Sequence, residues 1–227
     1  MNKKTTAIIC AYNEEKTIKE VLSIVCDHFF DEVIVVNDGS TDNTHDLLEE
    51  LNENYRFKYI KLDKNMGKGF AMATGIENAN SDIIVFVDAD LSNLKDEHFH
   101  KLLTPVLNDE ADMVLGQATE TLIKYNINPF KSFTGQRSVF KKDIQPIVDK
   151  MKHSRFGVET LINLYYQSEN KRVKYVMLKE LKHPTKFAKT TKTQAIREFV
   201  EVGHQIALTA FKNFDLVTSA VKNKMII

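Results

Sequence analysis

Between residues 83 and 90 the sequence reads Ile83-Ile84-Val85-Phe86-Val87-Asp88-Ala89-Asp90. Five consecutive apolar residues, four of them β-branched, are typical of a strand buried on both faces of a parallel sheet. Two carboxylates follow at positions i and i+2, and such a pair is costly unless a cation neutralises it. Hard oxygen ligands suit Mg²⁺ or Mn²⁺, so we expect Asp88 and Asp90 to hold one of these ions. The alternative is that they only cap the next helix.

Strand-like and helix-like segments alternate on both sides of this stretch. Short β-branched runs lie at 5–11, 32–37, 57–62, 82–87 and 112–115, with apolar residues at helical spacing at about 14–28, 42–53, 68–79 and 95–108. This alternation predicts an α/β fold: a mostly parallel sheet flanked by helices. Further along, the pattern predicts a helix over 157–169, a strand over 172–178 and a long amphipathic C-terminal helix over about 193–222, with Phe214, Val217 and Val221 in its apolar stripe.

The net charge, the number of cysteines and the lengths of the apolar stretches exclude several classes of protein. The formal net charge of the 227 residues is zero, so we expect no nucleic-acid partner. Cys10 and Cys26 lie in apolar segments and are too few for a disulfide framework, so we expect buried, reduced thiols. The first residues have no signal-peptide pattern, and no stretch approaches the roughly 20 apolar residues of a membrane span. These features predict a cytoplasmic location.

Polar residues gather where the predicted strands end. The first strand runs into Tyr12 and Glu14, and the second ends at Asp38. In open α/β sheets ligands bind at the carboxyl ends of strands, so these groups face one crevice if the first and fourth strands are neighbours. Asp38 could there accept hydrogen bonds from a nucleobase or ribose; the alternative is a turn in which Thr41 or Asp42 caps the next helix. Lys68 opens a helix, and the segment 65–69 lacks the spacing of a triphosphate-binding loop.

Four segments in a fixed order carry a family resemblance: Ala-Tyr-Asn-Glu-Glu at 11–15, Val-Asn-Asp-Gly-Ser-Thr-Asp-Asn-Thr at 36–44, Asn-Met-Gly-Lys-Gly at 65–69 and Asp-Ala-Asp-Leu at 88–91. Together they resemble the nucleotide-sugar half of glycosyltransferase family 2, which has the GT-A fold, and within it the dolichyl- and polyprenyl-phosphate sugar transferases. The match is specific over residues 5–91 and looser to about 180. We therefore expect a GT-A domain over 1–180, with a nucleotide-sugar half (1–116) and an acceptor half (117–180), and a basic helical extension over 181–227.

The resemblance also implies roles for single residues on the donor side. Ala11, Tyr12 and Glu14 would contact the base and ribose, with Asp38 against the base and Lys68 near the nucleotide. Asp88, Ala89 and Asp90 would carry the metal and the diphosphate. Family members of the GT-A fold sometimes add a histidine ligand, which here would be His183. Cys10 replaces a usual proline, and Ser92 stands where related mannosyltransferases have a metal-binding glutamine, so part of the metal shell departs from the pattern.

On the acceptor side the resemblance implies two further segments. Gly135-Gln136-Arg137 would hold an acceptor phosphate, with Arg137 as a bidentate fork. Arg155 and Glu159 belong to a segment that opens an acceptor-side helix, and Glu159 is the candidate base if the acceptor is an alcohol. The alternative for Glu159 is a first-turn acid favoured by the helix dipole.

The resemblance implies an inverting, metal-dependent transfer of a sugar from a UDP- or GDP-sugar to a polyprenyl or other lipid phosphate. The alternatives are transfer to a hydroxyl of a glycan or small soluble acceptor, and a non-catalytic module that binds sugar nucleotides. The basic approach Lys182, Lys186, Lys189 and Lys192 would let the C-terminal helix lie on the inner face of an anionic membrane. Docking of that helix on its own domain or on a second subunit of a homo-oligomer stays open.

Overall fold

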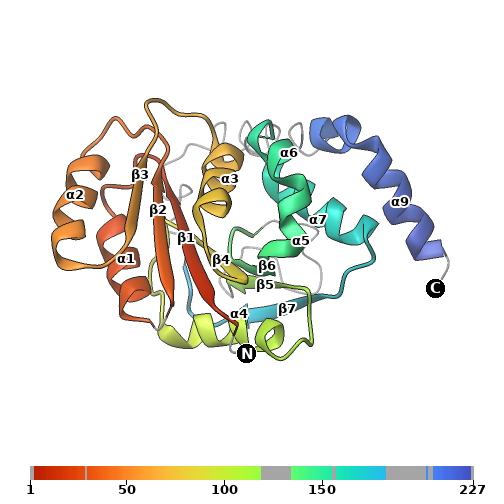
Figure 1. Ribbon diagram of the computed structural model, residues 1–227, viewed down its shortest axis with the longest axis horizontal. Helices are drawn as coiled ribbons and strands as arrows, with labels where there is room; N and C mark the ends of the chain where they lie inside the picture. Colours follow the sequence, from red (N-terminus) through yellow and green to blue (C-terminus); the bar gives the residue numbers. More distant parts are fainter. Residues whose placement is uncertain are drawn as a thin grey trace.

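The computed structural model describes residues 3–28, 30–118, 134–154, 157–182, 203 and 207–225. Seven strands form one sheet in the order β3-β2-β1-β4-β6-β5-β7 (Figure 1). The strands are β1 (Thr5–Ala11), β2 (Glu32–Asn37), β3 (Lys58–Lys61), β4 (Ile83–Asp88), β5 (Met113–Ala118), β6 (Arg137–Phe140) and β7 (Val173–Leu178). β6 is antiparallel to both of its neighbours, while the other pairs are parallel. The predicted mostly parallel α/β sheet is confirmed.

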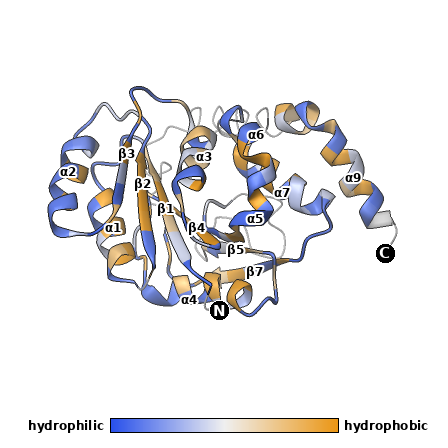
Figure 2. Ribbon diagram, viewed as in Figure 1, coloured by the Kyte–Doolittle hydropathy of each residue, from blue (hydrophilic) through white to orange (hydrophobic). Residues whose placement is uncertain are grey.

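Helices cover both faces of this sheet. They are α1 (Ile18–Asp27), α2 (Thr44–Asn54), α3 (Lys68–Asn78), α4 (Asp96–Leu107), α5 (Lys141–Ile144), α6 (Val148–Lys152), α7 (Val158–Ser168) and α9 (Phe214–Met225), with a 3₁₀ turn at Gln145–Ile147. Alternate residues of each strand point to opposite faces, so Ile9 packs in the core beneath α1, α2 and α4, whereas Ile8 packs beneath α3, α6 and α7. Figure 2 shows the resulting concentration of hydrophobic residues on the central strands.

The predicted strands and helices up to residue 118 are confirmed with ends that shift by a few residues. The short strand β6 was not predicted, because Arg137 and Ser138 interrupt any hydrophobic pattern although both are fully buried. It lies between β4 and β5, with Phe86 opposite Arg137 in register. The sheet therefore combines strands from both sides of residue 116.

The C-terminal helix differs from the expected one. Residues 193–202 and 204–206 of the predicted range 193–222 lie outside the described residues, and the described remainder includes α9. The face of α9 that docks carries Leu216, which packs on the core cluster, Ala220, which is buried, and Asn223, whose Nδ2 donates to the backbone oxygen of Ser168 at 2.8 Å on α7. The expected stripe residues Phe214 and Val221 are instead exposed, because the i, i+4, i+7 set 216, 220 and 223 faces the domain.

Two smaller expectations concern the cysteines and the membrane. Cys10 and Cys26 are both unpaired, as predicted, but each is partly exposed rather than fully buried. Within the described ranges, none of the helices combines the length and apolar character that crossing a bilayer requires.

Candidate active site

The polar ends of three adjacent strands meet at the carboxyl edge of the sheet. β1 lies between β2 and β4, and in register Ala11 pairs with Asn37 while Cys10 pairs with Asp88. The prediction that the first and fourth strands are neighbours is confirmed. The loops after these strands therefore lie together at one edge of the sheet, the crevice edge, where open α/β sheets bind their ligands.

Asp88 is held on both of its carboxylate oxygens. The ammonium of Lys68 lies 2.8 Å from Oδ1, and the amide Nε2 of Gln136 donates to Oδ2 at 2.7 Å. Its side chain retains 18% of its exposure. A side chain at Gly135 is sterically excluded, because a Cβ there would lie 2.1 Å from both carboxylate oxygens. The structure thus brings the predicted metal ligand together with two residues of the predicted acceptor segment.

Lys68 bridges two carboxylates from distant parts of the chain. As the first residue of α3, it also reaches Oε1 of Glu159, in the first turn of α7, at 2.7 Å. Burial alone would lower the pKa of the Lys68 ammonium, but the adjacent Asp88 and Glu159 carboxylates raise it above its ordinary value. Lys68 is therefore a fixed positive charge at the centre of the site. It joins the donor-side Asp88 to Glu159, the candidate base.

Asp38 is almost fully buried and bonds to the loop that precedes α3. Its two carboxylate oxygens accept the backbone N–H groups of Met66 at 2.7 Å and Gly67 at 2.9 Å. Gly67 has a φ of 95°, a conformation that glycine adopts without strain. Burial raises the pKa of Asp38 while these hydrogen bonds oppose the rise. Asp38 thus fixes the position from which Lys68 reaches Asp88, and its contact with a nucleobase stays a prediction.

The loop after β1 is tied to the loop after β2. Asn13 accepts the backbone N–H of Thr41 at 2.8 Å, and the backbone N–H of Glu14 donates to the Thr44 hydroxyl at 2.8 Å. Ala11 is buried, whereas Tyr12 is 43% exposed. An exposed phenol offers a flat face for a nucleobase, and the contact of Tyr12 with the base stays a prediction.

Arg137 lies below the site on β6 and has no exposed surface. Its guanidinium donates to the backbone oxygen of Thr134 at 2.5 Å and to Oδ1 of Asn163 at 3.4 Å. Within the described part of the chain its Nε has no partner, and burial lowers the pKa of the guanidinium. Thr134 and Asn163 were not singled out from the sequence, where an isolated polar residue gives no signal. Arg155 and His183 lie outside the described residues.

The side chains at the crevice fit a hard divalent cation. Asp88 and Asp90 supply carboxylate oxygens, Asp88 retains some exposure, and its carboxylate fills the place that a Cβ at Gly135 would take. Ala89 between them is buried, and Asp90 is half-buried. Carboxylates with room for water are the ligands that Mg²⁺ and Mn²⁺ prefer.

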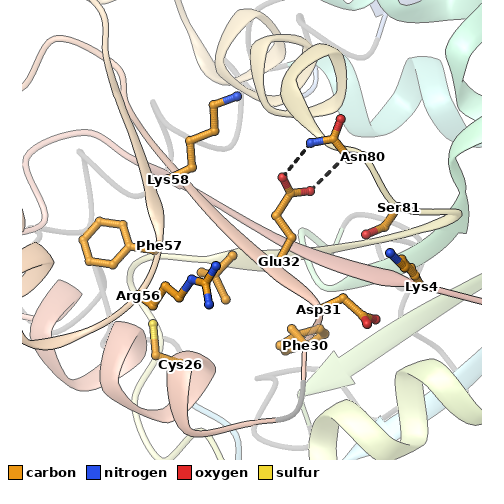
Figure 3. Close-up of a pocket in the computed structure, with 11 residues that line it drawn as sticks. Lys4, Cys26, Phe30, Asp31, Glu32, Arg56, Phe57, Lys58, Asn80 and Ser81 are labelled. Atoms are coloured by element: carbon orange, nitrogen blue, oxygen red, sulfur yellow. Dashed lines mark hydrogen bonds between the residues drawn. The ribbon is translucent and has the colours of Figure 1, made fainter.

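A cavity of about 650 Å³ lies at the opposite, amino edge of the sheet (Figure 3). Its two acidic residues already accept hydrogen bonds from neighbouring parts of the fold. Glu32 accepts both the side-chain and backbone N–H groups of Asn80, at 3.1 and 2.9 Å, and Asp31 accepts the backbone N–H of Thr5 at 2.8 Å. The cavity is therefore separate from the crevice that Asp88 and Asp38 line.

Comparison with known proteins shows which family the chain resembles. The family model described as Glycosyl transferase family 2 matches residues 6–137. The chain is 34% identical over 144 residues to the UDP-N-acetylglucosamine–dolichyl-phosphate N-acetylglucosaminyltransferase of Methanococcus voltae, covering 56% of this chain and 57% of that one. It is 39% identical over 87 residues to the poly-β-1,6-N-acetyl-D-glucosamine synthase of Staphylococcus aureus (strain COL), covering 37% of this chain and 21% of the other.

Solved structures show the same fold. Glucosyl-3-phosphoglycerate synthase from Mycobacterium tuberculosis, in complex with Mg²⁺ and UDP, has a TM-score of 0.70 at 18% identity, covering 92% of this chain and 79% of that one. This likeness confirms the GT-A architecture. The matches to the two curated relatives span 57% and 21% of those proteins' lengths. The ordered motifs, the sheet and the family model together show that this chain belongs to glycosyl transferase family 2.

Proposed function

We propose that this chain transfers a sugar, with inversion, from a UDP- or GDP-sugar to a polyprenyl phosphate or a related lipid phosphate. The observation that carries the proposal is the position of Asp88, whose carboxylate is held between Lys68 and Gln136. Gln136 directly precedes Arg137, which is buried. Lys68 supplies a cationic group beside the carboxylate that would hold the metal, where the anionic diphosphate would lie. The Methanococcus relative, whose name specifies a dolichyl-phosphate acceptor, supports the same choice.

The reaction joins an acceptor phosphate oxygen to the anomeric carbon of the sugar. The bond from that carbon to the diphosphate breaks, and the electron pair leaves with the nucleoside diphosphate. Asp88 and Asp90 would hold Mg²⁺ or Mn²⁺, whose chemistry at such a site is neutralisation of the charge on the departing diphosphate. Lys68, at 2.8 Å from Asp88, adds a fixed positive charge on the same side. A phosphate acceptor is already anionic, so it needs no strong base.

Transfer to a hydroxyl is the second candidate, and the position of Glu159 favours it. Its carboxylate shares the Lys68 ammonium with Asp88, so it lies beside the donor side of the crevice, where a base would be needed. The Staphylococcus relative is named for synthesis of a polysaccharide.

The test measures nucleotide release from a panel of UDP- and GDP-sugars with Mn²⁺ or Mg²⁺, with and without polyprenyl phosphate. Wild type, Asp90→Ala and the exposed-surface control Asp63→Ala are compared. Release from one donor that lipid phosphate stimulates, and that only Asp90→Ala abolishes, is the expected result. Release that a glycan stimulates instead would favour the hydroxyl acceptor, and Glu159→Gln would then be the next variant to test. No release from any donor would refute both.

A lipid acceptor also requires contact with a membrane, and the residues around the start of α9 offer a surface for it. Phe211 and Phe214 are 80% and 66% exposed, with Lys212 between them. Aromatic residues beside lysines suit an anionic membrane surface. Co-sedimentation with phosphatidylglycerol vesicles should fall for Phe211→Ser with Phe214→Ser and stay unchanged for Leu107→Ser, an exposed apolar residue at the end of α4. Equal sedimentation of both variants would exclude this surface.

A further inference from the structure

Three potential metal ligands meet at a place remote from the crevice. They are His28, which follows α1, and Asp96 and His100, which are one turn apart at the start of α4. One ligand atom of each lies within 4.8 Å of those of the other two. His28 precedes β2 by a few residues, so the cluster is at the amino edge of the sheet, whereas Asp88 ends β4 at the carboxyl edge.

The carboxylate of Asp96 connects the two imidazoles. Its Oδ1 contacts Nδ1 of His28, and its Oδ2 lies 3.0 Å from Nε2 of His100. The two rings approach edge to face, with centroids 5.3 Å apart. One nitrogen of each ring thus faces the same carboxylate, each at a different oxygen, and Asp96 and His100 share a helix face through their i, i+4 spacing.

The cluster has one rigid member and two adjustable ones. His28 retains only 5% exposure and packs against Phe30 and Phe99, with ring centroids 4.7 and 4.9 Å away. The side chains of Asp96 and His100 are 61% and 68% exposed. A bound ion would hold ligand atoms about 3–4 Å apart at bond lengths of about 2.0–2.2 Å. Small rotations of the two exposed side chains reach that spacing while His28 stays fixed, and water has access to the outer coordination positions.

We infer that His28, Asp96 and His100 form a second metal site, which takes a transition metal such as Zn²⁺. Two imidazoles and one carboxylate are the donors of zinc-type sites, whereas the all-oxygen pair Asp88 and Asp90 suits Mg²⁺ or Mn²⁺. The ion ties the end of α1 to the beginning of α4. Because it lies at the amino edge, it acts on the stability of the fold and leaves the donor crevice intact.

The experiment uses the full chain without a histidine tag, stripped with a chelator and kept in excess Mg²⁺ so that oxygen sites are occupied. Zn²⁺ binding is measured by calorimetry, Co²⁺ binding by its visible absorption, and the metal-dependent change in Tm by calorimetric scanning. The variants are His100→Ala and Asp96→Asn, whose side chains are exposed and should leave the fold intact. The matched control is His153→Ala, an exposed histidine elsewhere.

Wild type and His153→Ala should each bind one equivalent of Zn²⁺. The affinity of His100→Ala for Zn²⁺ should be about 10- to 100-fold lower, or binding should be lost. A hundred-fold excess of metal over Kd should raise the Tm of wild type by about 5 °C or more, and this rise should vanish in both cluster variants. Equal zinc affinity in wild type and His100→Ala, or no zinc uptake, would show that the cluster is only hydrogen-bonded. Neither result depends on the glycosyl-transfer assay.

Discussion

Gln136 and Asp88 are tied by two hydrogen bonds although 48 residues separate them in the chain. The amide Nε2 donates to Oδ2 of Asp88 at 2.7 Å, and the backbone N–H of Asp88 donates to the amide oxygen at 3.3 Å. The contact is possible because β6 lies directly beside β4. In the proposed metal site, this amide would fix the direction of the Asp88 lone pairs.

Replacement of Gln136 should therefore reduce activity more than stability. Gln136→Leu removes the donor to Asp88 and leaves that carboxylate free to turn, so we expect kcat/KM with Mn²⁺ to fall about 10- to 100-fold. Titration of Mn²⁺ in the nucleotide-release assay measures the effect. The control Gln145→Leu lies on an exposed turn and should keep wild-type values. An unchanged metal dependence in Gln136→Leu would contradict a positioning role for this amide.

A methyl group at position 135 should inactivate the site. In Gly135→Ala the new Cβ would lie 2.1 Å from both oxygens of Asp88, a distance that forces this short, hydrogen-bonded side chain to move. We expect at least a hundred-fold loss of nucleotide release with a cooperative unfolding transition retained. At Gly203, an added Cβ meets nothing within 4 Å, so Gly203→Ala is the matched control. Full activity of Gly135→Ala would mean that Asp88 is not held as the structure shows.

Removal of the Lys68 charge should leave two carboxylates without compensation. Lys68→Met deletes ion pairs of 2.8 and 2.7 Å to Asp88 and Glu159. Because these groups are mostly but not fully buried, we expect a loss of about 1–3 kcal/mol in the free energy of unfolding, measured by urea denaturation. The exposed control Lys61→Met should change it by less than about 0.5 kcal/mol. The double variant Lys68→Met/Glu159→Gln should recover part of the lost free energy of unfolding, because it removes one of the two uncompensated charges. No recovery would mean that Lys68 stabilises the fold by packing and not by its charge.

The two thiols should resist alkylation at neutral pH. Burial raises the pKa of Cys10 to about 12; the charge of Asp88 adds to this rise, and that of Lys68 works against it. Burial also raises the pKa of Cys26, to about 11. The thiolate is the reactive form, and a raised pKa keeps it scarce. At pH 8 iodoacetamide should react at least a hundred-fold more slowly than with the urea-unfolded chain. The native rate should still increase above pH 9, where that of the unfolded chain levels off near the ordinary pKa of about 8.5. Equal rates at pH 8 would contradict the shifts.

Much of the crevice could be predicted from local sequence. The apolar runs define β1, β2 and β4, and the carboxyl ends of parallel strands must meet at one edge, which brings Asp38 and Asp88 together. The partners of these residues could not be predicted in the same way. Lys68 and Glu159 are 91 residues apart, and Asp38 bonds to backbone N–H groups, which carry no side-chain signature.

The sequence by itself determined the alternation of strands and helices, the family and the carboxylates at the strand ends, because periodicity and short motifs are local properties of the chain. The tertiary structure decided what depends on packing between distant segments. It inserted β6 between β4 and β5, buried Arg137, directed Leu216 and Ala220 of α9 inward instead of Phe214, and assembled His28 with Asp96 and His100. The physical reason is that a buried polar residue or a helix face is stabilised by its long-range neighbours, and these exist only once the sheet has formed.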